Sequence, residues 1–117
     1  MNQQELGIFG EKQARHYLTN KGYIIRCTNY RKFKLELDLV CEKDNTLIIV
    51  EVKARATNEH GEPWMAVTRK KQKQIIKAAN YYIEEFDIHF ETRFDIISII
   101  HNGMRTEIEH IEDAFGP

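Results

Sequence analysis

Three residues in the middle of the chain, Asp38, Glu51 and Lys53, are of the types that cleave phosphodiester bonds with the help of a metal ion. Carboxylates are hard oxygen ligands that suit Mg²⁺, an ion that keeps several waters and is usually completed by substrate phosphate. The metal lowers the pKa of a bound water and neutralises charge that develops on the phosphate. A neighbouring lysine would position the attacking water or stabilise that charge as an ammonium, or deprotonate the water as a neutral amine.

Two neighbouring strands are expected to bring these residues together. Residues 35–41 alternate at period two, with leucines on one side of the strand and Asp38 on the other. Residues 47–52 form a largely β-branched run that places Glu51 and Lys53 on one side. A polar turn of about four residues joins the strands as a hairpin, so the three side chains can converge at the end far from the turn.

A purely structural explanation competes with this one. Glu51 interrupts an apolar run, and ionised carboxylates are rare in buried strands unless they are paired or bind a metal. An ion pair of Lys53 with Glu51 or with Asp38 would satisfy that requirement, and the strands alone leave both explanations open.

Composition limits the class of protein. The 117 residues suit one domain, and 17 basic against 18 acidic side chains exclude a generally polybasic protein. The charges are nonetheless segregated: residues 35–51 carry five acidic side chains and one basic, while residues 1–34 and 52–77 each carry seven basic and two acidic. The polar N-terminus and the lack of a long apolar run predict a cytoplasmic protein with no membrane segment, in which Cys27 and Cys41 are free thiols.

Periodicity predicts the remaining elements. Helical spacing covers Glu5–Lys21, where Gly22 is a stop, and a second helix runs from the N-cap Thr68 to about Phe86. Further strands are expected at Tyr23–Cys27, Phe94–Ile100 and Arg105–Ile111. The order α-β-β-β-α-β-β predicts an α/β sandwich around one mixed sheet.

The sequence resembles a known nuclease signature. Asp38, an interval of twelve residues, and then Glu51-Val52-Lys53 resemble the D…(D/E)xK pattern of the PD-(D/E)XK nuclease superfamily. Further matching positions follow in order from Leu6 to Ile100: Gly7 to Glu11, Ala14, Tyr17, Leu18, Gly22, Tyr23, Asn29 to Arg31, Glu36 to Val40, Val50 to Arg55, Ala66 to Thr68, Lys71, Ala78, Ala79 and Arg93 to Asp95. Together they resemble the YraN-like family of small uncharacterised bacterial proteins, related to the Holliday-junction resolvases. The resemblance implies a restriction-endonuclease-like sandwich, with a mixed central sheet flanked by helices.

The resemblance also implies roles. Asp38, Glu51 and the backbone carbonyl of Val52 would bind Mg²⁺ or Mn²⁺, Lys53 would be the catalytic lysine, and Glu11 would complete the site. The position of Glu11 on the border of its helix's apolar face allows that reach, although a first-turn carboxylate that favours the helix dipole is the alternative.

Two further positions follow from the same comparison. Glu36 and Gln72 match family positions and are expected to support the ligands rather than bind the metal. Leu35 departs from the pattern, because the family usually has a glycine there; the substitution leaves the ligands intact but alters the strand entrance.

Basic residues near the site are expected to contact phosphates without reading sequence. They are Arg31, Arg55, Arg69, Lys70, Lys71 and Lys73. A solvated helix face is the ordinary alternative for this run. Around Arg31, the aromatic ring of Tyr30 or of Phe33 is expected to be available for stacking on bases.

Two functions are therefore weighed. The first is a Mg²⁺- or Mn²⁺-dependent endonuclease acting on DNA, including branched or damaged DNA, with no small-molecule cofactor. The second is a nucleic-acid-binding subunit of a recombination, repair or DNA-processing complex with little turnover of its own, because 117 residues leave few elements beyond a catalytic core. The resemblance favours a homodimer, since related resolvases act as dimers that make paired cuts.

Overall fold

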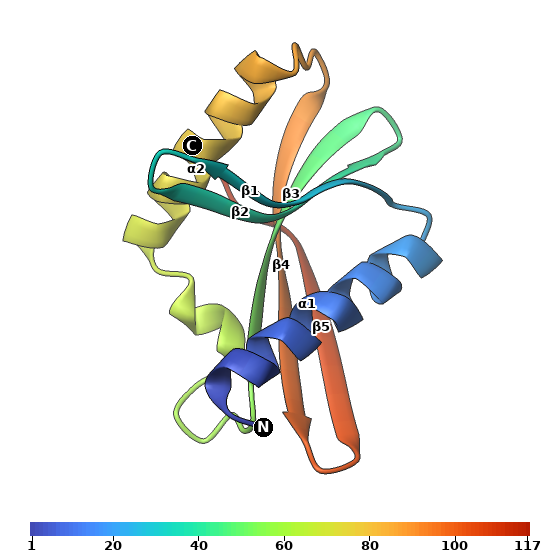
Figure 1. Ribbon diagram of the computed structural model, residues 1–117, viewed down its shortest axis with the longest axis vertical. Coiled ribbons are helices and arrows are strands. Elements are labelled where there is room, and N and C mark those ends of the chain that lie inside the picture. Colours follow the sequence, from blue (N-terminus) through green and yellow to red (C-terminus); the bar gives the residue numbers. More distant parts are fainter.

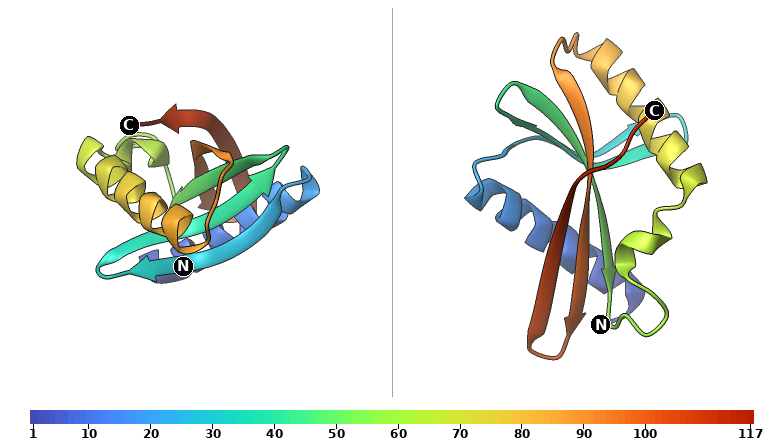
Figure 2. Two further views of the ribbon diagram at one scale, coloured as in Figure 1. Left: turned by 90° about the horizontal axis from the view of Figure 1, so that it is seen from above. Right: turned by 180° about the vertical axis from the view of Figure 1, so that it is seen from behind.

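A mixed five-stranded sheet with a helix on each face forms the protein (Figures 1 and 2). The structure, a computed structural model, describes residues 1–117. In chain order the elements are α1 (Gln3–Asn20), β1 (Ile24–Lys32), β2 (Leu35–Lys43), β3 (Thr46–Arg55), the short 3₁₀ helix η1 (Pro63–Ala66), α2 (Arg69–Glu85), β4 (Glu91–Asn102) and β5 (Arg105–Phe115). The predicted order of helices and strands and the α/β sandwich are confirmed.

The sheet has the spatial order β1-β2-β3-β4-β5, so every strand pairs with its neighbour in the sequence. All pairs are antiparallel except β3 and β4, which run parallel because α2 and η1 lie between them in the chain. The parallel pair extends over ten residues, from Thr46 opposite Glu91 to Arg55 opposite Ile100. The centre of the sheet is therefore its most continuous part.

Alternation along β3 divides the core into two layers. Ile48 and Val50 face α1, where they pack with Ala14 and Leu18 in one cluster. Ile49 faces α2, in a second cluster that includes the apolar stripe of that helix. The left view of Figure 2 shows the sheet lying between the two helices. The alternation predicted for β3 is confirmed.

Local signals set the helix ends. The side chain of Asn2 accepts a hydrogen bond from the backbone of Glu5, and the Glu5 carboxylate accepts one from the backbone of Asn2, so the pair caps the start of α1. Gly22, at a φ of 88°, follows the end of α1. Thr68 accepts a hydrogen bond from the backbone of Lys71 and is the predicted N-cap of α2.

The close packing of α1 on the sheet depends on Gly10. A Cβ atom at this position would lie 2.9 Å from the Cβ of Ala54. The absent side chain therefore lets α1 approach β3, which carries the predicted site residues.

Several predicted bounds were wrong. β1 is a nine-residue strand that continues to Lys32, and β5 continues to Phe115. The β2–β3 turn is shorter than predicted, because Asp44 and Asn45 both adopt positive φ and close it as a two-residue connection.

The predicted uniform face of leucines on β2 was also wrong. Leu37 packs in the α2-side cluster and Leu39 in the α1-side cluster, although they are two residues apart. Regular pleating would place both on one face, so β2 changes its orientation around Asp38. Leu35, at the entrance of this strand, is half-buried against the α2-side cluster.

Both cysteines are free thiols; Cys41 is buried and Cys27 is half-buried. Neither helix is long and apolar enough to cross a membrane.

Candidate active site

Asp38 lies where β2 separates from β3. The paired residues of these strands run from the turn only as far as Leu39 opposite Val50. Beyond that point, the Oδ2 atom of Asp38 accepts a hydrogen bond of 2.9 Å from the backbone N–H of Val52. If β2 and β3 had stayed paired, a backbone carbonyl of β2 would have accepted this hydrogen bond; the side chain of Asp38 accepts it instead. The hydrogen bond therefore holds the Asp38 carboxylate against β3.

Glu51 lies beside Asp38 and is almost completely buried, with only 3% of the residue exposed. Its side chain is on the α2 side of β3, and its Oε2 atom has no hydrogen-bond partner. The nearest cation is Lys71 of α2, whose Nζ atom lies 3.6 Å from Oε2. Burial, followed by the hydrogen bond and the charge of Asp38, raises the pKa of Glu51 to about 9, against the opposing charges of Lys71 and Lys53.

A second buried carboxylate, Asp95 in β4, shows what a structural acid looks like in this protein. Arg93 donates two hydrogen bonds of 2.9 Å to it, His110 contacts it at 2.7 Å, and the backbone N–H of Asp113 donates a third bond. Burial alone would raise the pKa of Asp95, but these hydrogen bonds hold it below its ordinary value. Glu51 has no comparable set of donors: the structure shows no ion pair of Lys53 with Glu51 or Asp38, and the one ion pair of Glu51, with Lys71, leaves its Oε2 atom without a hydrogen bond.

Glu11 approaches the carboxylates from α1. Burial first, and then the charges of Asp38 and Glu36, raise its pKa, whereas Arg15 and a hydrogen bond from Asn29 act in the opposite direction. Because α1 begins at Gln3, Glu11 lies in the middle of the helix, and the alternative role of a first-turn carboxylate is wrong. Glu11 therefore lies within electrostatic reach of Asp38.

The site combines groups from both faces of the sheet. Glu11 reaches it from α1, and Lys71 reaches it from α2, at the point where β2 and β3 separate. Lys53 is half-buried two residues beyond Glu51 on the same strand and forms no ion pair. Asp38 and Glu51 thus lie side by side with the charges of Lys71 and Lys53 acting on Glu51, whereas Glu11 acts on Asp38 and the three acids do not form one cluster that could hold an ion.

Other predicted residues lie further from this centre. Glu36 forms an ion pair of 3.3 Å with the exposed Arg31. Gln72 donates a hydrogen bond to the carbonyl of Val67 at the start of α2, so it fixes that connection rather than the carboxylates. Arg55 contacts the carbonyl of Ala54.

The basic run of α2 is exposed apart from Lys71. Arg69, Lys70 and Lys73 are exposed and form no ion pair with any carboxylate. Their charges are therefore available to a ligand, whereas that of Lys71 is shared with Glu51.

The role of Lys71 as the partner of Glu51 was missed from the sequence. A signal existed: Lys71 lies four residues before Ile75 and seven before Ala78, both buried, so it continues the apolar stripe of α2 toward the sheet. A lysine on such a stripe extends over the core and brings its ammonium to a buried acid.

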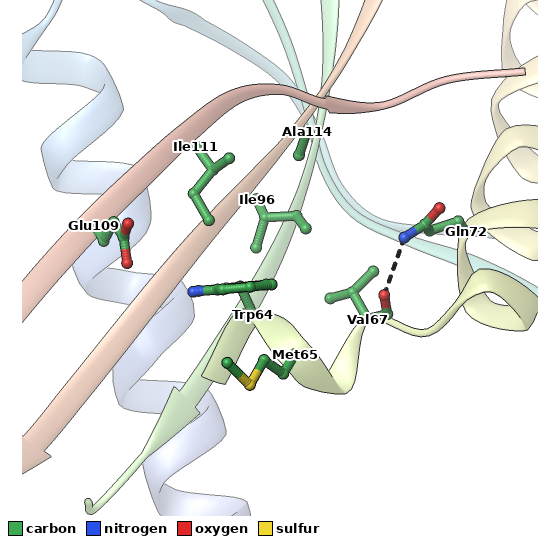
Figure 3. Close-up of a pocket in the computed structure, with 8 residues that line it drawn as sticks. All are labelled: Trp64, Met65, Val67, Gln72, Ile96, Glu109, Ile111 and Ala114. Atoms are coloured by element: carbon green, nitrogen blue, oxygen red, sulfur yellow. Dashed lines mark hydrogen bonds between the residues drawn. The ribbon is translucent and has the colours of Figure 1, made fainter. Parts of the chain in front are cut away.

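The largest cavity lies elsewhere. A cavity of about 520 Å³ is bounded by η1, the start of α2, β4 and β5, and most of its lining is apolar (Figure 3). The indole of Trp64 lies beneath Ile96 and Ile111, and the backbone N–H of Trp64 donates to Ser98. Trp64 therefore anchors its loop on the sheet.

Comparison with known proteins assigns a family. Residues 10–99 match the family described as uncharacterised protein family UPF0102. A UPF0102 protein of Christiangramia forsetii is 50% identical over 111 residues, which cover 95% of this chain and 93% of that protein. Relatives from Phocaeicola vulgatus and Natranaerobius thermophilus are each 44% identical, over 97% and 98% of this chain and 93% and 100% of their own lengths. The chain therefore belongs to the UPF0102 family, the YraN-like family that its motifs resemble.

Proposed function

We propose that this protein is a metal-dependent endonuclease that hydrolyses phosphodiester bonds in DNA. The observation that carries the proposal is the Oε2 atom of Glu51, a buried carboxylate oxygen without a hydrogen-bond partner beside a second carboxylate, Asp38. A divalent cation would satisfy that oxygen and remove the repulsion that the two acids have when both are ionised.

The residues present fit Mg²⁺ or Mn²⁺. Asp38 and Glu51 supply two carboxylates, and the backbone carbonyl of Val52 would supply a further oxygen. The chain has no cluster of three His, Cys, Asp or Glu side chains arranged to hold an ion. The remaining ligands would therefore be waters and a substrate phosphate, as is usual for Mg²⁺.

When bound, the metal supplies charge neutralisation and an acidified water. The chain's own groups do the rest. Lys53, which has no ion-pair partner, would donate a hydrogen bond from its Nζ atom to hold the attacking water or to stabilise the charge that develops on the phosphate. Lys71 keeps a positive charge beside Glu51. Arg69, Lys70 and Lys73 bind phosphates along the exposed face of α2.

A cleavage assay tests this proposal. End-labelled branched, nicked and single-stranded DNA is incubated with Mn²⁺ and wild-type protein, Asp38→Asn or Lys53→Ala. The matched control is Glu109→Gln, an exposed acid on β5, away from the site. Cleavage by the wild type and the control, lost by at least a hundredfold in both site variants, is expected. Cleavage that survives in both variants, or none by the wild type, contradicts the proposal.

Metal binding can be measured without cleavage. A metal that binds only the folded state stabilises it, by about 1.4 kcal/mol when its concentration is ten times Kd. Thermal unfolding with and without 10 mM Mn²⁺ should show this gain in the wild type and in Glu109→Gln, but not in Asp38→Asn. An equal shift in all three proteins would place the metal elsewhere.

The unpaired cations of α2 favour a second candidate, a nucleic-acid-binding subunit without turnover. These side chains would bind phosphates whether or not the carboxylates hold a metal. DNA binding that is unchanged by EDTA, together with no calorimetric heat for Mn²⁺, would favour this candidate over the nuclease.

A further inference from the structure

The tip of the β1–β2 hairpin carries the most exposed aromatic side chain of the protein, Phe33, at 78% exposure. Its backbone adopts a φ of 56°, in the left-handed region that is unfavourable for a bulky L-residue. Glycine would fit this turn at lower cost. An aromatic residue that is both strained and solvated points to a use for the side chain outside the fold.

The tip lies against α2. The rings of Phe33 and Tyr81 meet edge to face, with centroids 5.4 Å apart, and the Lys32 ammonium lies 5.9 Å from the Phe33 centroid. Figure 1 shows the β1–β2 hairpin extending to this helix. Phe33 and Tyr81 thus form an aromatic surface from two elements, and the charge of the adjacent Lys32 is shared with Glu85, whose carboxylate lies 3.7 Å from its Nζ atom.

Tyr30, the other aromatic residue predicted to be available for stacking, is not accessible. It is 8% exposed, its hydroxyl donates to Glu85, and its ring packs edge to face on Tyr82. The prediction for Tyr30 is therefore wrong, because β1 turns this side chain into the α2-side core. Phe33 is left as the ring that a base can reach.

A line of unpaired lysines connects the tip with the carboxylates. Lys70, Lys73 and Lys77 follow one another at helical spacing on the exposed surface of α2, and none forms an ion pair. Lys71 is the partner of Glu51, and Tyr81 lies ten residues further along α2. At a rise of 1.5 Å per residue, the distance from Lys71 to Tyr81 along the helix is about 15 Å. A stacked strand that advances about 3.4 Å per nucleotide covers this distance in about four nucleotides.

We propose that Phe33 stacks on an unpaired base about four nucleotides from the scissile phosphate, so that the substrate class is DNA with a single-stranded segment beside the cut. Bases within a duplex already stack on their neighbours, and a side chain outside the helix does not reach their faces. A basic track that ends in an aromatic ring is the arrangement that binds single strands without reading sequence. This inference rests on the proposed function and specifies its substrate.

The test measures binding in EDTA, where no cleavage occurs. Fluorescence anisotropy is recorded for a labelled 12-nucleotide oligothymidine and a labelled 12-base-pair duplex. Phe33→Ala should weaken binding of the single strand about 5- to 150-fold, the effect of one stacked base, and change duplex binding less than twofold. Phe33→Trp should keep the affinity. Met104→Ala, at the fully exposed tip of the β4–β5 hairpin, is the matched control and should change neither affinity.

Phe33→Gly separates the role of the side chain from that of the backbone. Because glycine suits the positive φ, this variant should unfold at a temperature no lower than the wild type and yet bind the single strand as weakly as Phe33→Ala. An unchanged affinity of Phe33→Ala for the single strand overturns the inference, as does an equal loss on both probes. Absence of binding by the wild type overturns it together with the premise that DNA is the ligand. Selective binding without cleavage supports the inference and defeats only the nuclease.

Discussion

Glu51→Gln is expected to stabilise the metal-free protein at neutral and alkaline pH. In the folded state, the pKa of Glu51 is raised from 4.5 to about 9, first by burial and then by Asp38, so the folded protein retains a proton that the unfolded chain has lost. Stability is therefore complete below the unfolded pKa and falls as the pH rises toward the folded value. Glutamine resembles the protonated acid, can donate to Asp38, and does not titrate.

The magnitude follows from the size of this shift. Each pH unit between the unfolded and folded pKa values costs 1.36 kcal/mol, so the wild type should lose on the order of 3 kcal/mol between pH 4.5 and pH 7 through this one group. Glu51 is 3% exposed, so solvent screens this cost little. For 117 residues, such a difference corresponds to roughly 10 °C in Tm.

Urea unfolding in EDTA, from pH 5 to pH 9, measures the effect as the difference between the wild type and Glu51→Gln. The difference should grow with pH in favour of the variant. The matched control is Glu36→Gln on the neighbouring strand; its carboxylate pairs with the exposed Arg31, and its loss should change stability by less than about 1 kcal/mol. Parallel curves for the wild type and Glu51→Gln would refute the reasoning, because they would mean that Glu51 is ionised at no cost.

Three further substitutions test neighbouring parts of the structure. Asp95→Asn breaks the buried network of β4 and should cost about 3–5 kcal/mol in urea unfolding; a loss below about 1 kcal/mol would contradict its structural role. Gly10→Ala sets a Cβ 2.9 Å from that of Ala54 and should cost about 1–3 kcal/mol, seen as a lower Tm, whereas an unchanged Tm would show that α1 can shift freely. Lys71→Gln removes a charge that lowers the pKa of Glu51, so in urea unfolding the loss of stability should continue to a higher pH than in the wild type, whose curve levels off near the folded pKa; curves that level off at the same pH would contradict the pairing.

The β3 strand shows what the sequence could predict. Its period-two pattern placed Ile49, Glu51 and Lys53 on one face, and the structure has Ile49 in the α2-side core and Glu51 paired with a lysine of α2. The alternation matters in this central strand because a shift of one residue would exchange its two buried faces and turn Glu51 into the apolar core beneath α1.

The β2 strand shows what the sequence could not predict. Alternation alone places Leu37 and Leu39 on one face, but they pack on opposite sides of the sheet. The change of orientation depends on a contact between strands, the hydrogen bond from the Val52 backbone to Asp38. Asn29, on the strand that pairs with β2, has a positive φ of 52° at the same level. Local propensity carries no signal for a bend that two partner strands produce together.

The charge pattern acquires a spatial meaning from the order of the strands. β5, with its acidic side chains, is one edge of the sheet, and the β1–β2 hairpin with its basic tip is at the other. The unpaired cations of α2 lie on the same side as that hairpin, because α2 packs on β1 and β2. A polyanion would therefore be attracted to one side of the protein and repelled from the other, even though the net charge is −1.

The carboxylates of Asp38 and Glu51 lie at the inner boundary of the attractive side, where β2 leaves β3. The proposed metal would neutralise the carboxylates of Asp38 and Glu51. A phosphate that approaches from the hairpin tip would then not be repelled by these two acids and could reach Lys53.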